Sequence, residues 1–420
     1  MLSYRLLNYP SGVLNKIYSK TLSNISVSYE LDQLPVATLT LPATEYVNIF
    51  DRKEIIIKDE GKCWGFRGLF DSDVITKESE AIDINFSHIL EEWQYERVPM
   101  NIALKQNSLS SIYQTPDIRF VVNGWNIILS PLASTTLIEY LFSKQTKLSA
   151  LSDVIKQTET LHFRVPLNSN RDLEVGEFGQ LKPYIITNHS QISSGQNIAV
   201  LKDLVISRDY SKIVNQVEVY SGNVGNGMGQ VTLREINDDV TLQNPSFPVG
   251  IGAYIPNDEL TYSVLDTIQV APNNNLSYII TDLASVAREN GKIYEGAFQY
   301  NDLYPIPFQD QEITNADRIE ITKRIYARSI RKLIANRRKT TYSLGVGTLN
   351  CDINVGDKIR LKYNNTLLQN TECGTKVKNE VVNIDKELYI LKLVKNFDET
   401  GLETNDLVLC EDLFSSMESI

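Results

Sequence analysis

Short segments in which apolar and polar residues alternate dominate the first 88 residues, and they limit the possible folds more than any other feature. A period of two indicates a half-buried β-strand, whereas an amphipathic helix repeats every three to four residues. Roughly five or six strands at such spacing predict a small β-barrel or sandwich. Residues 25–29, 36–41 and 82–86 alternate, residues 55–57 are an apolar run typical of a buried strand, and residues 63–70 are an aromatic segment interrupted by Gly65 and Gly68.

The composition is that of a soluble chain with several domains. The 420 residues are 42% hydrophobic and 22% charged. At 47.6 kDa the chain exceeds what one core usually serves, so we expect about two to four domains. The formal net charge of −11 argues against a dedicated nucleic-acid or anionic-membrane binder. The N-terminus lacks a secretory pattern, and residues 125–142 are too interrupted by polar residues to span a bilayer.

The rest of the chain divides by pattern into three parts. Residues 89–200 mix helical and strand spacing and predict a lateral α+β module. The β pattern returns at 201–235 and at 340–420, which together predict a second β-barrel. The proline-rich stretch 236–339 predicts an inserted α+β module. The predicted fold is therefore mainly β, with two small β-barrels, each followed or interrupted by a mixed α/β module.

Within the lateral module one helix has a clear signature. Leu148, Leu151, Val154 and Ile155 recur at helical spacing, and Thr146 or Ser149 is placed to cap the first turn.

Cysteine and histidine offer little for metal or catalytic chemistry. No pair of the four cysteines has ligand spacing, so we expect reduced, packed thiols and neither metal nor cofactor. His88 and His162 fall in or at the end of predicted strands and are expected to be structural, whereas His189 belongs to a polar loop. The cysteines are Cys63, Cys351, Cys373 and Cys410.

Paired carboxylates and a glycine cluster fit solvated surface better than catalysis. Asp71 with Asp73, and Glu91 with Glu92, lack any sign of facing one bond at a defined separation, so we expect a solvated rim. The glycine-rich segment 221–230 runs into a predicted strand and not into a helix N-terminus, which favours a mobile loop over a phosphate site. We therefore expect no enzyme activity.

The most unusual segment is a basic helix predicted between Arg318 and Lys339. It contains nine Lys or Arg residues and one acidic residue, Glu320. It could be a solvated outer face, an interface with acidic surfaces of neighbouring subunits, or a contact with nucleic-acid phosphates. The candidates for a subunit interface or channel lining are Arg324, Arg328, Arg331 and Lys332.

Several short motifs resemble phage tail hub proteins. Residues 28–32 running into 37–42, followed by 65–70, resemble the N-terminal barrel of these hubs. Residues 204–222 resemble the opening of their second barrel, and 354–360 resemble the beginning of a strand in that barrel. The family is the N-terminal module of the siphophage tail-associated lysins, which is related to the hubs of contractile tails and of type VI secretion spikes.

The resemblance implies a homotrimer at the tail tip of a virion, made in the host cytoplasm. Two barrels per subunit would form a pseudo-sixfold ring that matches a hexameric distal tail protein and forms or closes the DNA exit channel. Implied partners are the distal tail protein, the tape measure protein, receptor-binding proteins, genomic DNA in the channel, and the host cell wall. Family members often carry a hydrolase or receptor-binding extension after the hub, and we expect none in a chain that stops at Ile420.

Two other functions remain open at this point. A cell-wall-degrading enzyme, such as a peptidoglycan hydrolase, could keep its site in the α+β modules. A saccharide receptor-binding protein could use Trp64, Trp93 or Trp125 as stacking platforms, although each tryptophan stands in an apolar setting that favours a place in the core.

Overall fold

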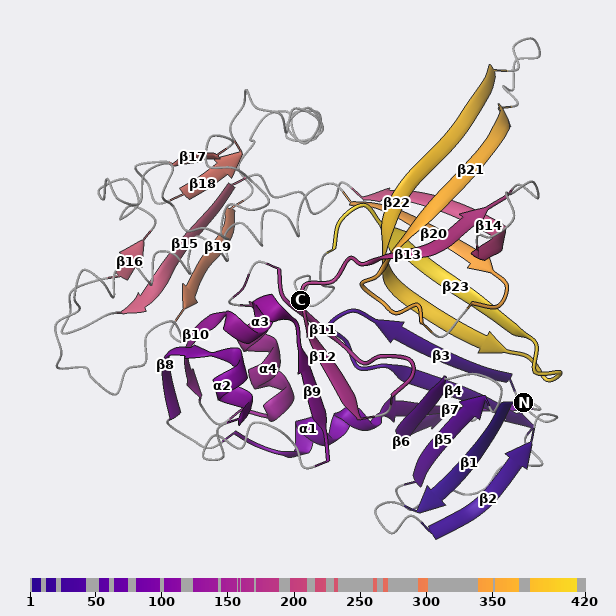
Figure 1. Cartoon of the computed structure of the whole chain (residues 1–420), viewed down its shortest axis with the longest axis horizontal. Coiled ribbons are helices and arrows are strands. Elements are labelled where there is room, and N and C mark those ends of the chain that lie inside the picture. Colours follow the sequence, from indigo (N-terminus) through magenta and orange to yellow (C-terminus); the bar gives the residue numbers. More distant parts are fainter. Residues whose placement is uncertain are drawn as a thin grey trace.

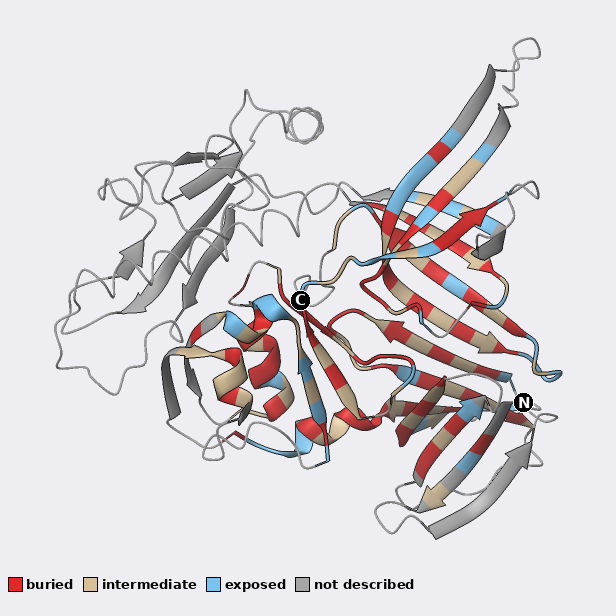
Figure 2. Ribbon diagram, in the orientation of Figure 1, coloured by how far each residue is buried: buried red, intermediate tan, exposed pale blue. Residues whose placement is uncertain are grey.

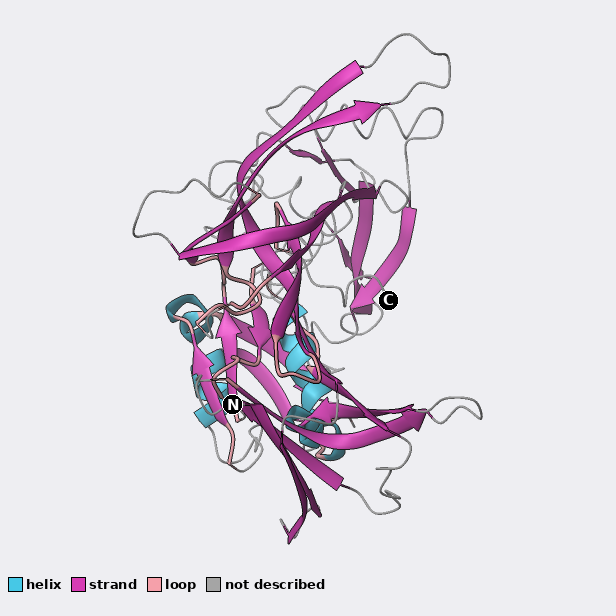
Figure 3. Ribbon diagram, turned by 90° about the vertical axis from the view of Figure 1, so that its right-hand side faces the viewer, coloured by secondary structure: helices cyan, strands magenta, loops and turns pink. Residues whose placement is uncertain are grey.

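The protein is mainly β, and its helices are confined to one module among the residues that the structure describes (Figures 1 and 3). This computed structural model confirms the predicted mainly β fold with α+β parts. The basic helix predicted from Arg318 lies outside the described residues, and Lys339 already begins a strand. The described residues are 2–8, 13–19, 24–42, 53–59, 64–74, 81–98, 102–114, 124–142, 145–156, 158, 160–169, 171–188, 197–209, 216–223, 230–232, 260–262, 267–270, 294–300, 339–349, 352–369 and 378–413.

The first seven strands form one antiparallel row in the order β2-β1-β5-β6-β7-β4-β3. The barrel expected from residues 1–88 is therefore an open sheet. The far edge of β3, where closure would be needed, is taken by β22 from the C-terminal part of the chain. The strands are β1 (Leu2–Asn8), β2 (Val13–Ser19), β3 (Asn24–Glu30), β4 (Val36–Pro42), β5 (Lys53–Asp59), β6 (Gly65–Val74) and β7 (Ala81–His88).

The alternating sequence pattern produces an alternating burial pattern in this sheet (Figure 2). Ile25, Val27 and Tyr29 of β3 are buried, while the residues between them are only partly covered. The same alternation holds along β7, where Ile84 and Phe86 are inaccessible to solvent. The sheet thus buries one face, as the period of two predicts.

Six further strands pair in a circuit, β22-β21-β13-β14-β20-β23, and β23 pairs again with β22. Tyr389 of β22 has Lys358 as its partner on one edge and Cys410 on the other, so β21 and β23 flank the same strand. β13 runs parallel to both of its neighbours, and the other pairs are antiparallel. The strands are β13 (Leu181–Thr187), β14 (Asn197–Asp209), β20 (Lys339–Val346), β21 (Lys358–Gln369), β22 (Lys378–Phe397) and β23 (Glu403–Cys410).

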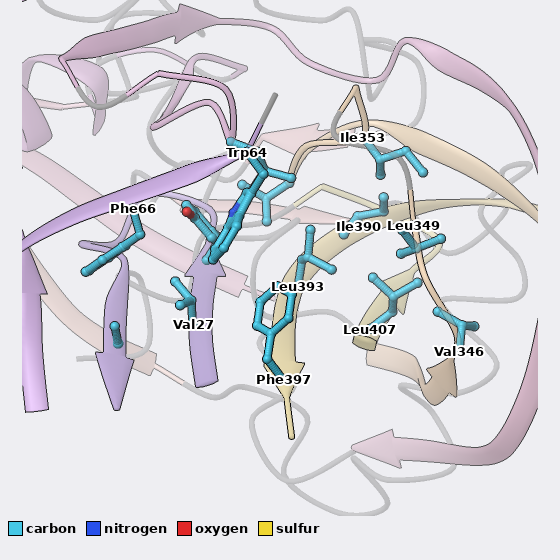
Figure 4. Close-up of a cluster of buried hydrophobic side chains, with 14 of the residues drawn as sticks. Val27, Trp64, Phe66, Val346, Leu349, Ile353, Ile390, Leu393, Phe397 and Leu407 are labelled. Atoms are coloured by element: carbon cyan, nitrogen blue, oxygen red, sulfur yellow. The ribbon is translucent and has the colours of Figure 1, made fainter. Parts of the chain in front are cut away.

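β22 belongs to both groups of strands and joins them into one thirteen-stranded sheet. It pairs with β21 up to Tyr389, passes a bulge between Ile390 and Lys392, and pairs with β3 from Lys392 onward. One hydrophobic core runs across the join (Figure 4). Val27 and Phe66 contribute from the first row, and Leu393 and Leu407 contribute from the circuit.

The α+β module between the two groups has its own core. Helix α4 follows Thr146, whose hydroxyl accepts a hydrogen bond from the Ser149 N–H at 3.2 Å, as predicted for an N-cap. The elements are η2 (Ile89–Glu91), α1 (Glu92–Tyr95), β8 (Ile102–Ser108), α2 (Leu109–Gln114), β9 (Asn126–Leu129), α3 (Pro131–Thr135), β10 (Leu137–Phe142), α4 (Lys147–Lys156), β11 (His162–Arg164) and β12 (Asp172–Gly176).

A separate five-stranded sheet contains the remaining strands (Figure 1). β15 and β16, which precede residue 236, pair within this sheet together with three strands of the inserted stretch. Among the described residues, no helix is both long and apolar enough to cross a membrane. The strands are β15 (Gln216–Asn223), β16 (Gln230–Thr232), β17 (Leu260–Tyr262), β18 (Thr267–Val270) and β19 (Tyr294–Tyr300).

Candidate functional site: a buried three-way junction

A short segment around β11 holds the α+β module against both groups of strands. Leu161, Phe163 and Val165 are buried in the core of the α+β module, while Leu167 belongs to the core of the thirteen-stranded sheet. The segment therefore passes from one core into the other. Alternate positions place His162 and Arg164 on the opposite face of the strand, where both meet charged partners.

Asp32 connects this segment to the end of β3. Its backbone N–H donates to the Phe163 carbonyl at 3.0 Å, and its carboxylate accepts the Phe163 N–H at 2.7 Å. The second carboxylate oxygen lies 2.6 Å from Nδ1 of His162. Asp32 is 1% exposed and has a φ of 58°, a left-handed conformation that Asp tolerates better than most residues. The side chain thus supplies partners for two buried donors of the neighbouring module.

Arg164 connects the same segment to the six-strand circuit. One terminal nitrogen of its guanidinium donates to the Val355 carbonyl at 2.7 Å and to Asp357 at 2.8 Å, while Nε donates to Glu174 at 2.6 Å. The guanidinium also lies over the Phe178 ring, 4.2 Å from its centre. A guanidinium presents several donors in a fixed plane, so it can serve these acceptors at once where a lysine could not.

The turn at residues 354–357, which accepts the hydrogen bonds from Arg164, is itself hydrogen-bonded to the bulge of β22. The Gly356 N–H donates to the Ile390 carbonyl at 2.7 Å, and the Ile390 N–H donates to the Asp357 carbonyl at 2.9 Å. Gly356 has a φ of 85°, and a Cβ there would stand 2.9 Å from Cβ of Phe178. Glycine is therefore required at this position for both backbone and packing reasons.

The adjoining residue of β22 connects to the first row of strands. Leu31, the residue before Asp32, donates its backbone N–H to the Leu391 carbonyl at 3.1 Å. The end of β3, the β11 segment and the bulge of β22 are thus linked by direct hydrogen bonds. All three structural parts meet here, and we call this meeting point the junction; it comprises residues 31–32, 162–167, 354–357 and 390–391.

A second buried charge lies under the same join. Lys395 of β22 is 2% exposed, and its ammonium group donates to Glu403 at 2.8 Å. Asn405 donates to Glu403 at 3.0 Å and to the Gly347 carbonyl at 2.7 Å. Trp64 from the first row packs on Phe397 with ring centres 5.1 Å apart and covers this group (Figure 4). The charges are paired and enclosed, as buried ions must be.

The histidine predictions are confirmed where the structure describes them. His88 is buried, and its Nδ1 accepts a hydrogen bond from the Leu90 N–H at 3.2 Å. Burial lowers the pKa of His88 to about 3, and the positive charges of Arg171 and Arg67 add to this effect. His88 is therefore a neutral structural residue. His162 is also buried and belongs to the junction, whereas His189 lies outside the described residues.

The three tryptophans lie in the core and not on a saccharide-binding surface. Trp64, Trp93 and Trp125 are 3%, 0% and 7% exposed. The prediction of a solvated rim is wrong for Glu92, because this carboxylate accepts hydrogen bonds from Trp125 at 3.3 Å and from Arg171 at 3.2 Å. The sequence pattern missed these contacts because the partners are far apart along the chain.

Other predicted candidates are only partly described. Cys410 is buried and forms no disulfide with a described residue, while Cys63, Cys351 and Cys373 lie outside the described residues. In the part of the chain that the structure describes, no three His, Cys, Asp or Glu side chains gather as metal ligands would. The interface candidates Arg324, Arg328, Arg331 and Lys332 lie outside the described residues.

Solved structures resemble this one over nearly the full length of the chain, whereas no protein-family model and no curated protein matches the sequence. The prophage tail protein gp18 from Listeria monocytogenes EGD-e is 11% identical, with a TM-score of 0.51 over 100% of this chain and 97% of its own. The tail protein from Neisseria meningitidis MC58 is 11% identical, with a TM-score of 0.51 over 98% and 97%. The 43 kDa tail protein of prophage MuSo2 from Shewanella oneidensis is 10% identical, with a TM-score of 0.52 over 97% and 98%. The chain therefore has the fold of these phage tail proteins.

Proposed function

We propose that this protein is a structural hub subunit of a phage tail tip or baseplate. The observation that carries the proposal is the likeness over the full chain to three tail proteins. The junction supports it, because its hydrogen bonds fix the modules to one another and a structural subunit must keep its modules in a constant orientation. The buried charged side chains of the junction pair with side chains of neighbouring modules, and this arrangement suits a scaffold better than an enzyme.

In this proposal three copies form a ring around the DNA exit channel. The thirteen-stranded sheet supplies each copy with two groups of strands, which together would give the ring pseudo-sixfold symmetry. A ring of that kind would match a hexameric distal tail protein on one side. The tape measure protein, receptor-binding proteins, the passing genome and the host cell wall would be further partners, and Arg324, Arg328, Arg331 and Lys332 would serve the subunit interface or the channel.

The test is the solution mass of the full chain, measured by multi-angle light scattering across salt concentrations, followed by binding to the distal tail protein of the same phage. We expect a mass of about three times 47.6 kDa, alone or on the distal tail protein. A chain that stays monomeric at high concentration and shows no affinity for that protein would overturn the proposal. Hydrolysis of host cell wall in a zymogram would overturn its non-enzymatic part.

A further inference from the structure

The far end of the β21–β22 hairpin is a two-stranded ribbon. β13 pairs with β21 no further than Lys362, and β23 pairs with β22 only from Tyr389 onward. Beyond these points, residues 364–369 pair with residues 378–383 and with no other described strand. The ribbon projects from the circuit at the top of Figures 1 and 3. Two strands alone are marginally stable in water, so a further strand would stabilise the ribbon.

Asn188 shows which backbone groups of β21 point to the outer edge of the ribbon. Its side-chain amide donates to the Asn364 carbonyl at 2.9 Å and accepts the Asn364 N–H at 3.2 Å, which imitates one step of a strand pair. The backbone polar groups of Asn364 therefore point away from β22. Because this direction alternates along a strand, the N–H and C=O groups of Thr366 and Leu368 point to the same outer edge. No described strand pairs with this edge beyond Asn188.

The opposite end of the sheet carries a second open edge. β2 is the terminal strand of the thirteen-stranded order and pairs, among the described strands, with β1 alone. β2 lies at the bottom of Figure 1 and the ribbon lies at the top, so the two edges lie on opposite sides of the molecule. Open edges are usually protected by proline or charge. Residues 364–369 contain neither, and residues 13–19 contain one lysine and no proline.

We propose that the ribbon of one copy adds as a strand to β2 of the next copy. Such a contact is made by backbone hydrogen bonds between edges of similar length. Each chain carries both halves, so the contact is head to tail and repeats from copy to copy until the ring closes. The inference rests on the ring of the proposed function and names the surface that builds it.

The first experiment removes the two outward N–H groups. In Thr366→Pro/Leu368→Pro, proline takes edge positions whose N–H does not serve the β21–β22 ladder, so the ribbon itself should persist. The matched control, Thr366→Ala/Leu368→Ala, changes the same side chains and keeps both N–H groups. Light scattering of the full chain should give trimers for the wild type and the alanine variant. The proline variant should dissociate at a concentration about tenfold higher or more.

The second measurement is amide hydrogen exchange of the assembled wild-type protein. The Thr366 and Leu368 amides, and the outward amides of β2, should exchange slowly in the trimer and fast after dilution to monomer. A proline variant that retains wild-type mass and concentration dependence, or fast exchange at Thr366 and Leu368 in the trimer, would overturn the inference and leave the proposed trimer standing. A wild type that is monomeric both alone and on the distal tail protein would overturn the two together.

Discussion

Asp32 and Phe163 hold each other by two hydrogen bonds that run in opposite directions. The Asp32 N–H donates to the Phe163 carbonyl at 3.0 Å, and the Phe163 N–H donates to the Asp32 carboxylate at 2.7 Å. The residues stand 131 positions apart in the chain and belong to different modules. Since both are buried, water cannot replace either bond if the modules separate.

Asp32→Ala should therefore destabilise the protein strongly. The change leaves the Phe163 N–H and His162 without their carboxylate partner in a buried place, at a cost of about 2–4 kcal/mol in the free energy of unfolding. Urea denaturation followed by circular dichroism measures this cost. Asp71→Ala, at an exposed carboxylate of the first sheet, is the matched control and should change little. Equal midpoints for the two variants would contradict the role given to Asp32.

Replacing Arg164 should show that the guanidinium plane matters as well as the charge. Arg164→Ala takes from Asp357, which is 1% exposed, its nearer cation and leaves the Asn354 N–H at 3.0 Å and Lys182 at 3.6 Å, so it should cost about 3–5 kcal/mol. Arg164→Lys should recover only a minor part of this, since an ammonium group cannot reach all three acceptors at once. Arg360→Ala, which breaks an exposed pair with Asp385, is the control and should have little effect. Full recovery by lysine would refute the argument from geometry.

His88 should make stability fall with acidification. The pKa is near 6.5 in the unfolded chain and about 3 in the native protein, so between these pH values the unfolded state binds a proton that the native state does not. Stability should fall as pH drops from about 6.5 toward 3, by up to ~1.4 kcal/mol per unit, with no contribution above pH 6.5. His88→Asn keeps an acceptor for the Leu90 N–H and removes this titration. Its unfolding free energy should depend less steeply on pH across that range, and identical slopes would contradict the prediction.

Two glycines allow a matched comparison of backbone strain. Gly356→Ala forces a side chain into a left-handed conformation and against Phe178, which should cost about 1–3 kcal/mol. Gly347→Ala meets nothing within 4 Å and has no positive φ, so it should be close to neutral. The midpoints of thermal unfolding of the two variants provide the measurement, and the midpoint of Gly356→Ala should be the lower. A neutral Gly356→Ala would mean that the turn adapts without loosening the junction.

The basic residues of the inserted stretch give a prediction on assembly. If Arg324, Arg328 and Arg331 contact acidic surfaces of a neighbouring copy, the triple change to Glu should weaken the trimer and make assembly less sensitive to salt. The triple change to Lys keeps the charge and is the control. Light scattering across salt concentrations provides the measurement. Unchanged mass and salt dependence in the Glu variant would return these residues to a solvated surface.

Individual strands could be predicted from the sequence, because a sheet with one buried face requires an apolar residue at every second position. Residues 25–29 and 36–41 show it directly in β3 and β4. In β22 the charged run Asp385, Lys386 and Glu387 interrupts the period of two. In the structure these three residues are exposed and remain paired with β21 in one strand of 20 residues.

The junction could not be predicted from any local pattern. His162 and Asp32 are separated by 130 positions, and nothing near either residue indicates the other. His162 and Arg164 alternate with the apolar residues of segment 161–165, and this pattern alone predicts only an ordinary strand with a polar face. Asp32 and Asp357 stand within the motifs that resemble tail hub proteins, yet their role follows only from the folded arrangement.

The sharing of β22 between two groups of strands has a mechanical consequence. Over residues 392–397 the strand is flanked by β3 on one edge and by β23 on the other. Antiparallel hydrogen bonds lie across the strands, so a pull along β22 loads both ladders in shear and all of their bonds at once. A strand loaded in this way yields at much higher force than one peeled off bond by bond. Tension arriving at the ribbon would thus pass along β22 into the first sheet, and the strands on both edges of β22 would resist its extraction together.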